Sequence, residues 1–367
     1  MILLLCFAIW LYLAFFHGRF WDSGPELLPA TPLEVLDVDI IIPARDEVET
    51  IGPVIASLVS QDYPGTFRVI LVDDNSTDGT ALAAGVHERL SILNGQDKPP
   101  GWSGKLWALA QGVAASTAPV ILFADADITH DPRHLATLVA KMNTERLQMV
   151  SEMVRLNCAS LPEKFLIPAF IYFFQMLYPF AKVNDQRSRV AAAAGGTVLI
   201  RREALARIGG LEAMKGALID DVTLAAKVKK NGPIYLGHSG LATSIRPYPK
   251  ARDIWDMIAR TAFTQLRYSA LILIGTIIGL ALVWLVFPFA TLCAGFGWRA
   301  ALGLAIWAIA ALTYFPTLDR YKVHRAYAIA LPAIALFYMA ATIASAVNYW
   351  LGRGAKWKAR AYTGEPS

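Results

Sequence analysis

The stretch of residues 120–127 constrains the fold of this chain more than any other. Its first five residues, Val-Ile-Leu-Phe-Ala, form a continuous apolar run that is typical of a strand buried on both faces, and Asp125 and Asp127 follow at its end. Because an ionised carboxylate is costly to bury without a partner, the strand must end where a sheet edge faces a crevice. In open α/β sheets, ligands bind at this carboxyl edge. We therefore predict an α/β fold with a ligand site at Asp125 and Asp127.

Two interpretations of this aspartate pair remain open from the residues alone. Side chains two positions apart in an extended segment share one face, so Asp125 and Asp127 could hold one hard cation. Mg²⁺ or Mn²⁺ prefers such oxygen ligands together with phosphate. The alternative is a helix cap or a solvated turn without a ligand.

Two earlier segments show the same arrangement of an apolar strand followed by polar residues. Residues 38–42 are followed by Pro43-Ala44-Arg45-Asp46-Glu47, and residues 67–72 are followed by Asp73-Asp74-Asn75-Ser76-Thr77-Asp78. Each turn leads into a helical pattern, and alternating strands and helices of this length predict a mostly parallel sheet. Three acidic strand ends at one sheet edge would repel each other unless a cation or hydrogen-bond donors lie among them, which favours a ligand site.

The rest of the chain is rich in long apolar segments, and 55% of all residues are hydrophobic. We predict a membrane anchor at residues 1–21, a cytoplasmic α/β domain at 22–269, about three transmembrane helices within 270–350 and a basic tail at 351–367. A cleaved signal peptide is the alternative for residues 1–16. By the positive-inside rule, Arg19 places the following domain in the cytoplasm. Three later spans would then place the basic tail outside, which conflicts with the same rule, so either one segment is re-entrant or the tail is an exception to the rule.

Two further helices are predicted to lie in the membrane interface, at residues 162–183 and 251–270. The first contains Pro168, Gln175 and Pro179 in its apolar run, which favours an interfacial helix over a span. The net charge of +5 comes from Lys and Arg that lie largely beside apolar segments, so anionic lipid headgroups fit it better than nucleic acid. Three scattered cysteines define no disulfide framework or zinc site.

The three strand-end motifs together resemble the nucleotide-binding half of family-2 glycosyltransferases, which have the Rossmann-like GT-A fold. Ile-Ile-Pro-Ala-Arg-Asp-Glu, Val-Asp-Asp-Asn-Ser-Thr-Asp-Gly-Thr and Ala-Asp-Ala-Asp occur in that family's order and at its usual spacing. The resemblance implies that the first turn holds the nucleoside, through Pro43, Ala44, Arg45 and Glu47. It also implies that Asp74, assisted by Asp73, binds the uracil edge, that Asp125 lies by the ribose and diphosphate, and that Asp127 ligates the metal.

The same resemblance assigns an acceptor side and a general base. Residues 189–200 resemble the family's acceptor-side strand and contain Gly195, Gly196 and Thr197. The family then has an acidic pair, usually Glu-Asp, whose second member is the base; this chain has Asp220-Asp221, so the resemblance implies Asp221 as base and Asp220 as its neighbour. An attacking hydroxyl must lose its proton to such a carboxylate. A helix N-cap is the alternative and is compatible with catalysis.

Two cationic residues complete the predicted site. Lys105 opens a helix beside the crevice, where it could bind a diphosphate or a sugar hydroxyl, although a solvated lysine is equally consistent. The segment Thr264-Gln265-Leu266-Arg267-Tyr268 is similar to the family's Gln-x-x-Arg-Trp motif, with Gln displaced by one position and Tyr in place of Trp. It implies a diphosphate contact for Arg267 and an acceptor-site wall at Tyr268; a basic interfacial helix that binds anionic lipid is the alternative.

The pattern as a whole is most similar to the hopanoid-associated branch of bacterial family-2 glycosyltransferases, including Pro-Pro-Gly-Trp-x-Gly-Lys-x-Trp-Ala and Phe-Thr-Gln-Leu-Arg-Tyr. This resemblance implies an inverting, metal-dependent enzyme of the bacterial inner membrane that transfers a sugar from a UDP-linked donor to a lipid such as a hopanoid. Ceramide and polyprenyl phosphate remain open as acceptors. A processive polysaccharide synthase and a non-catalytic, nucleotide-sensing membrane scaffold are the alternative functions.

Overall fold

The computed structural model describes residues 1–215, 220–293, 295–353, 356–357 and 360–361, without the side chains of Asp220 and of the four residues after 355. Lys358 of the predicted basic tail therefore lies outside the described residues. The chain divides into two compact units. We call Pro25–Asn157 and Lys182–Arg246, with the described residues after 355, the sheet unit. We call Met1–Gly24, Cys158–Ala181 and Pro247–Ala355 the helical unit.

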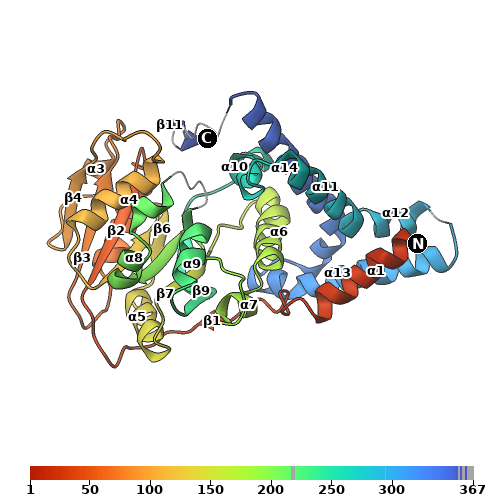
Figure 1. Ribbon diagram of the computed structural model, residues 1–367, viewed down its shortest axis with the longest axis horizontal. Coiled ribbons are helices and arrows are strands. Elements are labelled where there is room, and N and C mark those ends of the chain that lie inside the picture. The colour runs from red at the N-terminus through yellow and green to blue at the C-terminus, as the bar shows by residue number, and fades with distance from the viewer. Residues whose placement is uncertain (216–219, 294, 354–355, 358–359, 362–367) are drawn as a thin grey trace. The chain divides into compact units, whose positions relative to one another are not determined.

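The sheet unit is built on one large mixed sheet (Figure 1). Among the described residues it has nine strands in the order β1-β9-β7-β8-β5-β2-β3-β4, with β6 beside β9. The strands are β1 (Glu26–Leu27), β2 (Val38–Ala44), β3 (Phe67–Asp73), β4 (Leu90–Asn94), β5 (Val120–Ala124), β6 (Ile128–His130), β7 (Met149–Arg155), β8 (Thr197–Arg201) and β9 (Ile234–Ser244). β10 (Lys356–Trp357) and β11 (Arg360–Ala361) form a separate antiparallel pair.

Most neighbouring strands run parallel, as the alternation of strands and helices predicts. β2, β3, β4 and β5 are mutually parallel, and so are β1, β9 and β7, whereas β8 and β6 run antiparallel to their neighbours. Every residue of β2 and of β5 is buried, which explains their continuous apolar sequences. This mixed, mostly parallel α/β sheet confirms the predicted GT-A fold class.

Helices of the sheet unit follow most of the parallel strands. They are α2 (Ile51–Val59), α3 (Thr80–Ala83), α4 (Gly104–Ala115), α5 (His134–Thr144), α8 (Arg202–Arg207), the 3₁₀ helix η1 (Leu211–Met214) and α9 (Asp220–Lys229). α4 begins at Gly104, where the sequence predicts it, because the side chain of Ser103 caps it by accepting a hydrogen bond from the Leu106 amide at 3.2 Å. α4 lies close to β2, since a Cβ on Gly112 would stand only 2.3 Å from the Ile41 side chain.

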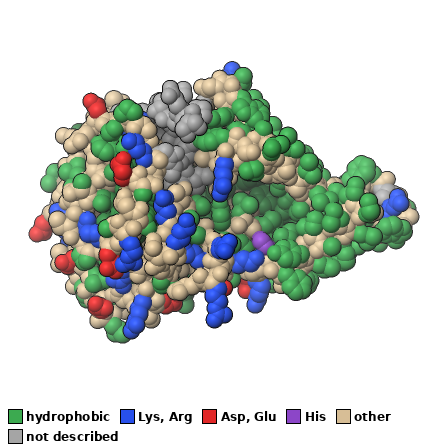
Figure 2. Space-filling view, viewed as in Figure 1, with side chains coloured by type: hydrophobic (Ala, Val, Ile, Leu, Met, Phe, Trp, Pro, Cys, Tyr) green, Lys and Arg blue, Asp and Glu red, His purple; other side chains and the backbone are tan. Residues whose placement is uncertain are grey.

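The helical unit contains the apolar segments. Its helices are α1 (Ile2–Phe15), α6 (Leu161–Leu177), α10 (Ala251–Gln265), α11 (Ala270–Trp284), α12 (Val286–Cys293), α13 (Trp298–Arg320), the 3₁₀ helix η2 (Arg325–Ala330) and α14 (Leu331–Trp350); α7 (Phe180–Asn184) lies at the boundary between the units. Large apolar side chains such as Leu271, Ile278 and Phe289 are exposed on this unit, and Figure 2 shows its hydrophobic surface in green. Such a surface is typical of contact with lipid rather than water.

Two segments of the described chain are long and apolar enough to cross a membrane, by length and composition: Trp298–Arg320 and Arg325–Trp350. The bent pair of α11 and α12 would make a third if it forms one broken span. α1 has 14 residues, which corresponds to about 21 Å of helix and is shorter than the roughly 30 Å hydrocarbon core. The anchor at residues 1–21 therefore stays a prediction.

The division into units differs from the predicted continuous domain at residues 22–269, because α6 and α10 belong to the helical unit. The reason is packing that the local sequence does not reveal. On α6, the Tyr172 hydroxyl lies 2.7 Å from that of Thr313 on α13, and the Leu166 carbonyl accepts a hydrogen bond from Tyr338 of α14 at 2.8 Å. On α10, the Phe263 amide donates to the Ser345 hydroxyl of α14 at 3.0 Å, so both predicted interfacial helices pack with apolar helices.

A buried polar cluster lies between β6, α5 and β7. Nδ1 of His130 is 3.1 Å from Nδ1 of His134, whose Nε2 contacts the Glu152 carboxylate. All three side chains are buried, and His130 Nε2 has no hydrogen-bond partner among the described residues. Burial, together with the neighbouring His134, holds the pKa of His130 well below its usual value. His130 therefore stays neutral in the native protein.

This neutral histidine predicts a loss of stability in mild acid. Below pH about 6.5 the unfolded chain takes up a proton at His130 that the native protein does not, so the free energy of unfolding should fall by about 1.4 kcal/mol between pH 7.5 and 5.5. Denaturant unfolding of the purified protein at the two pH values measures this change. His130→Gln should remove that part of the pH dependence, whereas the control His87→Gln should not. An unchanged pH dependence in His130→Gln would contradict the assignment.

Candidate active site

The ends of three strands meet at one edge of the sheet. In the parallel register Ala44 lies opposite Asp73, and Ile41 lies opposite Phe123, so the carboxyl ends of β2, β3 and β5 are neighbours. The turns after these strands contain the acidic residues that the sequence singles out. The sheet therefore brings together residues that lie far apart along the chain.

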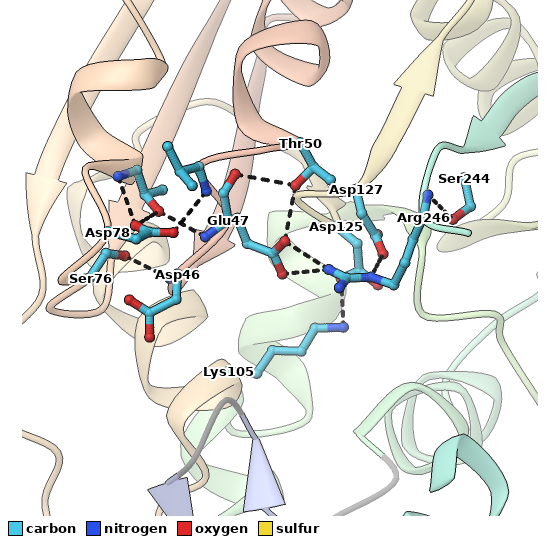
Figure 3. Close-up of polar contacts among 12 residues, drawn as sticks. Asp46, Glu47, Thr50, Ser76, Asp78, Lys105, Asp125, Asp127, Ser244 and Arg246 are labelled. Carbon is cyan, nitrogen blue, oxygen red and sulfur yellow. Dashed lines mark hydrogen bonds and ion pairs between the residues drawn. The ribbon is translucent and has the colours of Figure 1, made fainter. Parts of the chain in front are cut away.

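Hydrogen bonds tie the turn after β2 to the turn after β3 (Figure 3). The backbone amide of Asp46 donates to the Ser76 hydroxyl at 3.0 Å, and the Glu47 amide donates to the Thr80 hydroxyl at 2.8 Å. The carboxylate of Asp78 accepts a hydrogen bond from the Val48 amide at 3.0 Å. Although burial alone would raise it, hydrogen bonds from Thr80 and from backbone amides lower the pKa of Asp78. These hydrogen bonds join the two turns into one rim.

Asp74 is the most deeply placed acid of this rim. Its side chain is completely buried, and its backbone amide donates to the Ala44 carbonyl at 2.8 Å. Nη1 of Arg45 donates to the Asp74 carbonyl and lies 3.8 Å from the Asp74 carboxylate. The Asp73 carboxylate accepts from the Ser76 amide at 3.0 Å. The rim therefore presents a buried carboxylate beside a guanidinium, a pair that can bind a polar ring edge by hydrogen bonds.

Each aspartate after β5 has a cationic partner. Lys105 Nζ, at the start of α4, lies 2.7 Å from the Asp125 carboxylate. Arg246 Nε lies 2.6 Å from the Asp127 carboxylate. Figure 3 shows the Lys105 and Arg246 side chains pointing toward these two acids. Asp125 and Asp127 are thus part of a charge network in the turn between β5 and β6 and cap no helix.

Arg246 is the site residue that sequence reasoning missed. Besides Asp127, its Nη2 donates to both carboxylate oxygens of Glu47, each at 2.7 Å. The available signal was a charged residue two positions after a strand, similar to the rule that identified Asp125. It was overlooked because residues 234–244 contain glycines and serines and do not resemble a buried strand. β9 is nevertheless a strand with neighbours on both sides, β7 and β1.

A cavity of about 390 Å³ opens in the sheet unit beside this network. Its wall includes Pro43, Lys105, Asp125, Gly195 and Asp221, which are five of the predicted site residues. The remaining wall is apolar and comes from α4, β5, β8, η1 and α9: Leu106, Leu109, Phe123, Ala124, Val198, Leu211, Met214 and Leu224. The cavity therefore brings a cation and two carboxylates from three distant segments to one place.

Asp221 lies in the first turn of α9, and Gly195 makes room for it. The Asp221 carboxylate accepts a hydrogen bond from the Val222 amide at 2.8 Å. A Cβ on Gly195 would stand 3.1 Å from the same carboxylate. A carboxylate at a helix N-terminus interacts favourably with the helix dipole and with the free backbone amides. The position of Asp221 is therefore compatible with both interpretations of the acidic pair, as a helix cap and as a proton acceptor.

The other predicted residues lie elsewhere or outside the described side chains. Asp220 opens α9, but its side chain is not described. Thr197 is completely buried at the start of β8, and a Cβ on Gly196 would meet Ile128 at 2.5 Å, so neither residue is on the cavity wall. Arg267 and Tyr268 belong to the helical unit, and their roles stay predictions.

The described residues contain no group of three or more His, Cys, Asp or Glu side chains arranged to hold a metal ion by themselves. Mg²⁺ is usually bound by only one or two carboxylates together with substrate phosphates. Asp125 and Asp127 offer such a pair. Both acids face a positive charge within 2.7 Å, so this part of the crevice stabilises a cation. These two carboxylates fit a divalent ion whose coordination is completed by diphosphate oxygens.

Comparisons with known proteins agree with this class of fold. The chain resembles, with a TM-score of 0.56 and 18% sequence identity, the solved structure of the mannosyltransferase PcManGT from Pyrobaculum calidifontis in complex with GDP-Man and Mn²⁺; the match covers 96% of this chain and 99% of that one. At this low sequence identity, the similarity is evidence for the fold alone. The sheet unit thus has the GT-A fold.

Residues 39–209 match the model of glycosyl transferase family 2. The chain is also 32% identical over 106 residues to an uncharacterized glycosyltransferase of Mycobacterium tuberculosis and 39% identical over 90 residues to the 4,4'-diaponeurosporenoate glycosyltransferase of Staphylococcus aureus. These matches cover 29% and 24% of this chain, and the chain spans only 44% and 24% of the length of these relatives. Residues 39–209 are therefore similar in sequence to family-2 glycosyltransferases.

Proposed function

We propose that this protein is a membrane-bound glycosyltransferase that moves a sugar from a nucleoside diphosphate to a hydroxyl group of a lipid. UDP is the nucleotide that we propose for the rim at Asp73 and Asp74. The observation that carries the proposal is the single cavity that Lys105, Asp125 and Asp221 share at the carboxyl edge of the sheet. A cation, a diphosphate-side acid and a proton acceptor are the groups that such a transfer needs.

The donor half of the proposal rests on the rim and the turn after β5. Asp74, with Asp73, binds the edge of the base, and Pro43, Ala44, Arg45 and Glu47 form the nucleoside side. Lys105 neutralises diphosphate oxygens, and Asp125 and Asp127 hold Mg²⁺ or Mn²⁺. When bound, such an ion stabilises the negative charge that develops on the leaving diphosphate. The P. calidifontis structure, which contains GDP-Man and Mn²⁺, supports both the donor class and the metal.

The transfer step needs one proton acceptor. The oxygen of the acceptor hydroxyl attacks the anomeric carbon, its proton passes to the Asp221 carboxylate, and the bond from that carbon to the diphosphate oxygen breaks with its electron pair. A single displacement of this kind inverts the anomeric configuration. Asp220 assists from the neighbouring position, and Gly195, which lies on the cavity wall, shapes the acceptor side.

The lipid acceptor is inferred from the membrane character of the chain. Two helices have the length and composition of membrane spans, and the helical unit exposes large apolar side chains. An enzyme placed at the bacterial inner membrane with its sheet unit in the cytoplasm meets both a soluble donor and a lipid hydroxyl. A hopanoid is the acceptor that we propose first, from the sequence resemblance.

Mass spectrometry of lipids from cells with and without the gene tests this function. We expect a lipid that is larger by one sugar residue only in cells that contain the gene, and we expect purified protein to release nucleoside diphosphate when given that lipid without the sugar. Complementation with Asp221→Asn should leave the lipid unmodified. Identical lipid profiles in the two strains, together with no nucleotide release from any sugar donor, would contradict the proposal.

A further inference from the structure

Arg246 holds two acidic side chains of the donor crevice at the same time. Its Nε is 2.6 Å from Asp127, and its Nη2 is 2.7 Å from each oxygen of Glu47, which also accepts a hydrogen bond from Thr50 at 3.0 Å. The Asp127 carbonyl accepts from the Ile245 amide at 2.9 Å, so the backbone holds Arg246 in register with its partner. The arrangement is visible at the centre of Figure 3.

These ion pairs are partly buried and remain partly accessible to water. The Glu47 and Asp127 side chains are 11% and 19% exposed, whereas that of Arg246 is 32% exposed. Two carboxylates in such a place repel each other unless a cation lies between them. The planar guanidinium suits this position because it can donate to several oxygens in fixed directions. Arg246 is therefore the counter-ion of the acid that is predicted to ligate the metal.

We propose that Arg246 exchanges one of its partners when the donor binds. Its Nε leaves Asp127, which then binds the divalent ion, and donates to the diphosphate instead. Its Nη2 keeps its hydrogen bonds to Glu47. This inference rests on the proposed function, since it assigns a role at the same donor site. A diphosphate presents oxygens of the same charge and bidentate geometry as a carboxylate, so the guanidinium loses no ionic partner in the exchange.

The exchange has a consequence that a purely structural arginine would not have. Without nucleotide, Arg246 competes with a metal ion for the Asp127 oxygens, so it weakens metal binding. With the diphosphate present, the same side chain contributes to binding. Removing its charge should therefore change the two affinities in opposite directions, and metal and donor should bind cooperatively in the native protein.

Isothermal titration calorimetry on the purified full-length protein tests this. Arg246→Gln should bind Mn²⁺ alone about tenfold more tightly than the native protein, and UDP in the presence of Mn²⁺ about tenfold or more weakly, as expected for loss of a charge-assisted hydrogen bond. Arg133→Gln, which removes an arginine paired with Asp131 in the same unit, is the matched control and should change neither affinity.

Arg246→Lys covers the case in which the glutamine variant fails to fold. It keeps the charge but cannot bridge two carboxylates, so it should show the same two opposite changes with smaller factors. Parallel changes of both affinities, or an unchanged affinity for Mn²⁺ alone, would overturn the exchange while leaving the proposed function intact. A native protein that binds neither UDP nor GDP with Mn²⁺ would overturn both.

Discussion

Asp221→Asn is expected to lower the rate of sugar transfer by about 10²- to 10⁴-fold, the usual contribution of a general base. The variant keeps the size of the side chain and a carbonyl oxygen that can still accept from the Val222 amide, so α9 should begin as before. Its amide cannot accept the proton of the attacking hydroxyl. The measurement is kcat for release of nucleoside diphosphate with donor and lipid acceptor.

Four further measurements separate this effect from general damage. Donor affinity and thermal stability should remain close to those of the native protein, because Asp221 has no part in the nucleoside rim. Glu88→Gln, the same kind of change at an exposed residue of the sheet unit, should leave kcat unchanged. Asp220→Asn should have a smaller effect than Asp221→Asn. If the two variants lose equal activity, or if Asp221→Asn is fully active, the base is another residue.

Asp127→Asn is expected to reduce kcat/KM by at least about 100-fold, because a metal that stabilises developing charge contributes several kcal/mol to the barrier. In the native protein, EDTA should abolish transfer and added Mn²⁺ or Mg²⁺ should restore it. The variant should need far more metal than the native protein for the activity that remains. Steady-state kinetics over a range of metal concentrations measure both effects.

The matched control for this change is Asp131→Asn, four positions further along the chain. Asp131 forms an ion pair with Arg133 at 2.8 Å, away from the cavity wall, so its variant should respond to metal as the native protein does. Activity that persists in EDTA would show that Asp125 and Asp127 only form ion pairs with Lys105 and Arg246 and bind no metal. The proposal would then need a transfer reaction without a metal.

The strand ends of the donor half could be predicted because burial leaves local traces. Residues 120–124 are apolar throughout because β5 is buried on both faces, and Asp125 marks the point where that burial ends. The same logic located the ends of β2 and β3. β9 left no such trace, because its glycines and serines do not resemble a buried strand, and Arg246 at its end was therefore missed.

The amino-acid sequence by itself determined the class of fold, the acids at the strand ends and the apolar helices, because each follows from how a short segment meets water or a neighbouring layer. Only the tertiary structure decided which charges face each other. Asp127 and Glu47 meet Arg246 from 119 and 199 positions away, and the pairing of Asp125 with Lys105 follows from α4 packing on the sheet. Ion pairs depend on distance in space, and no local pattern of residues records that distance.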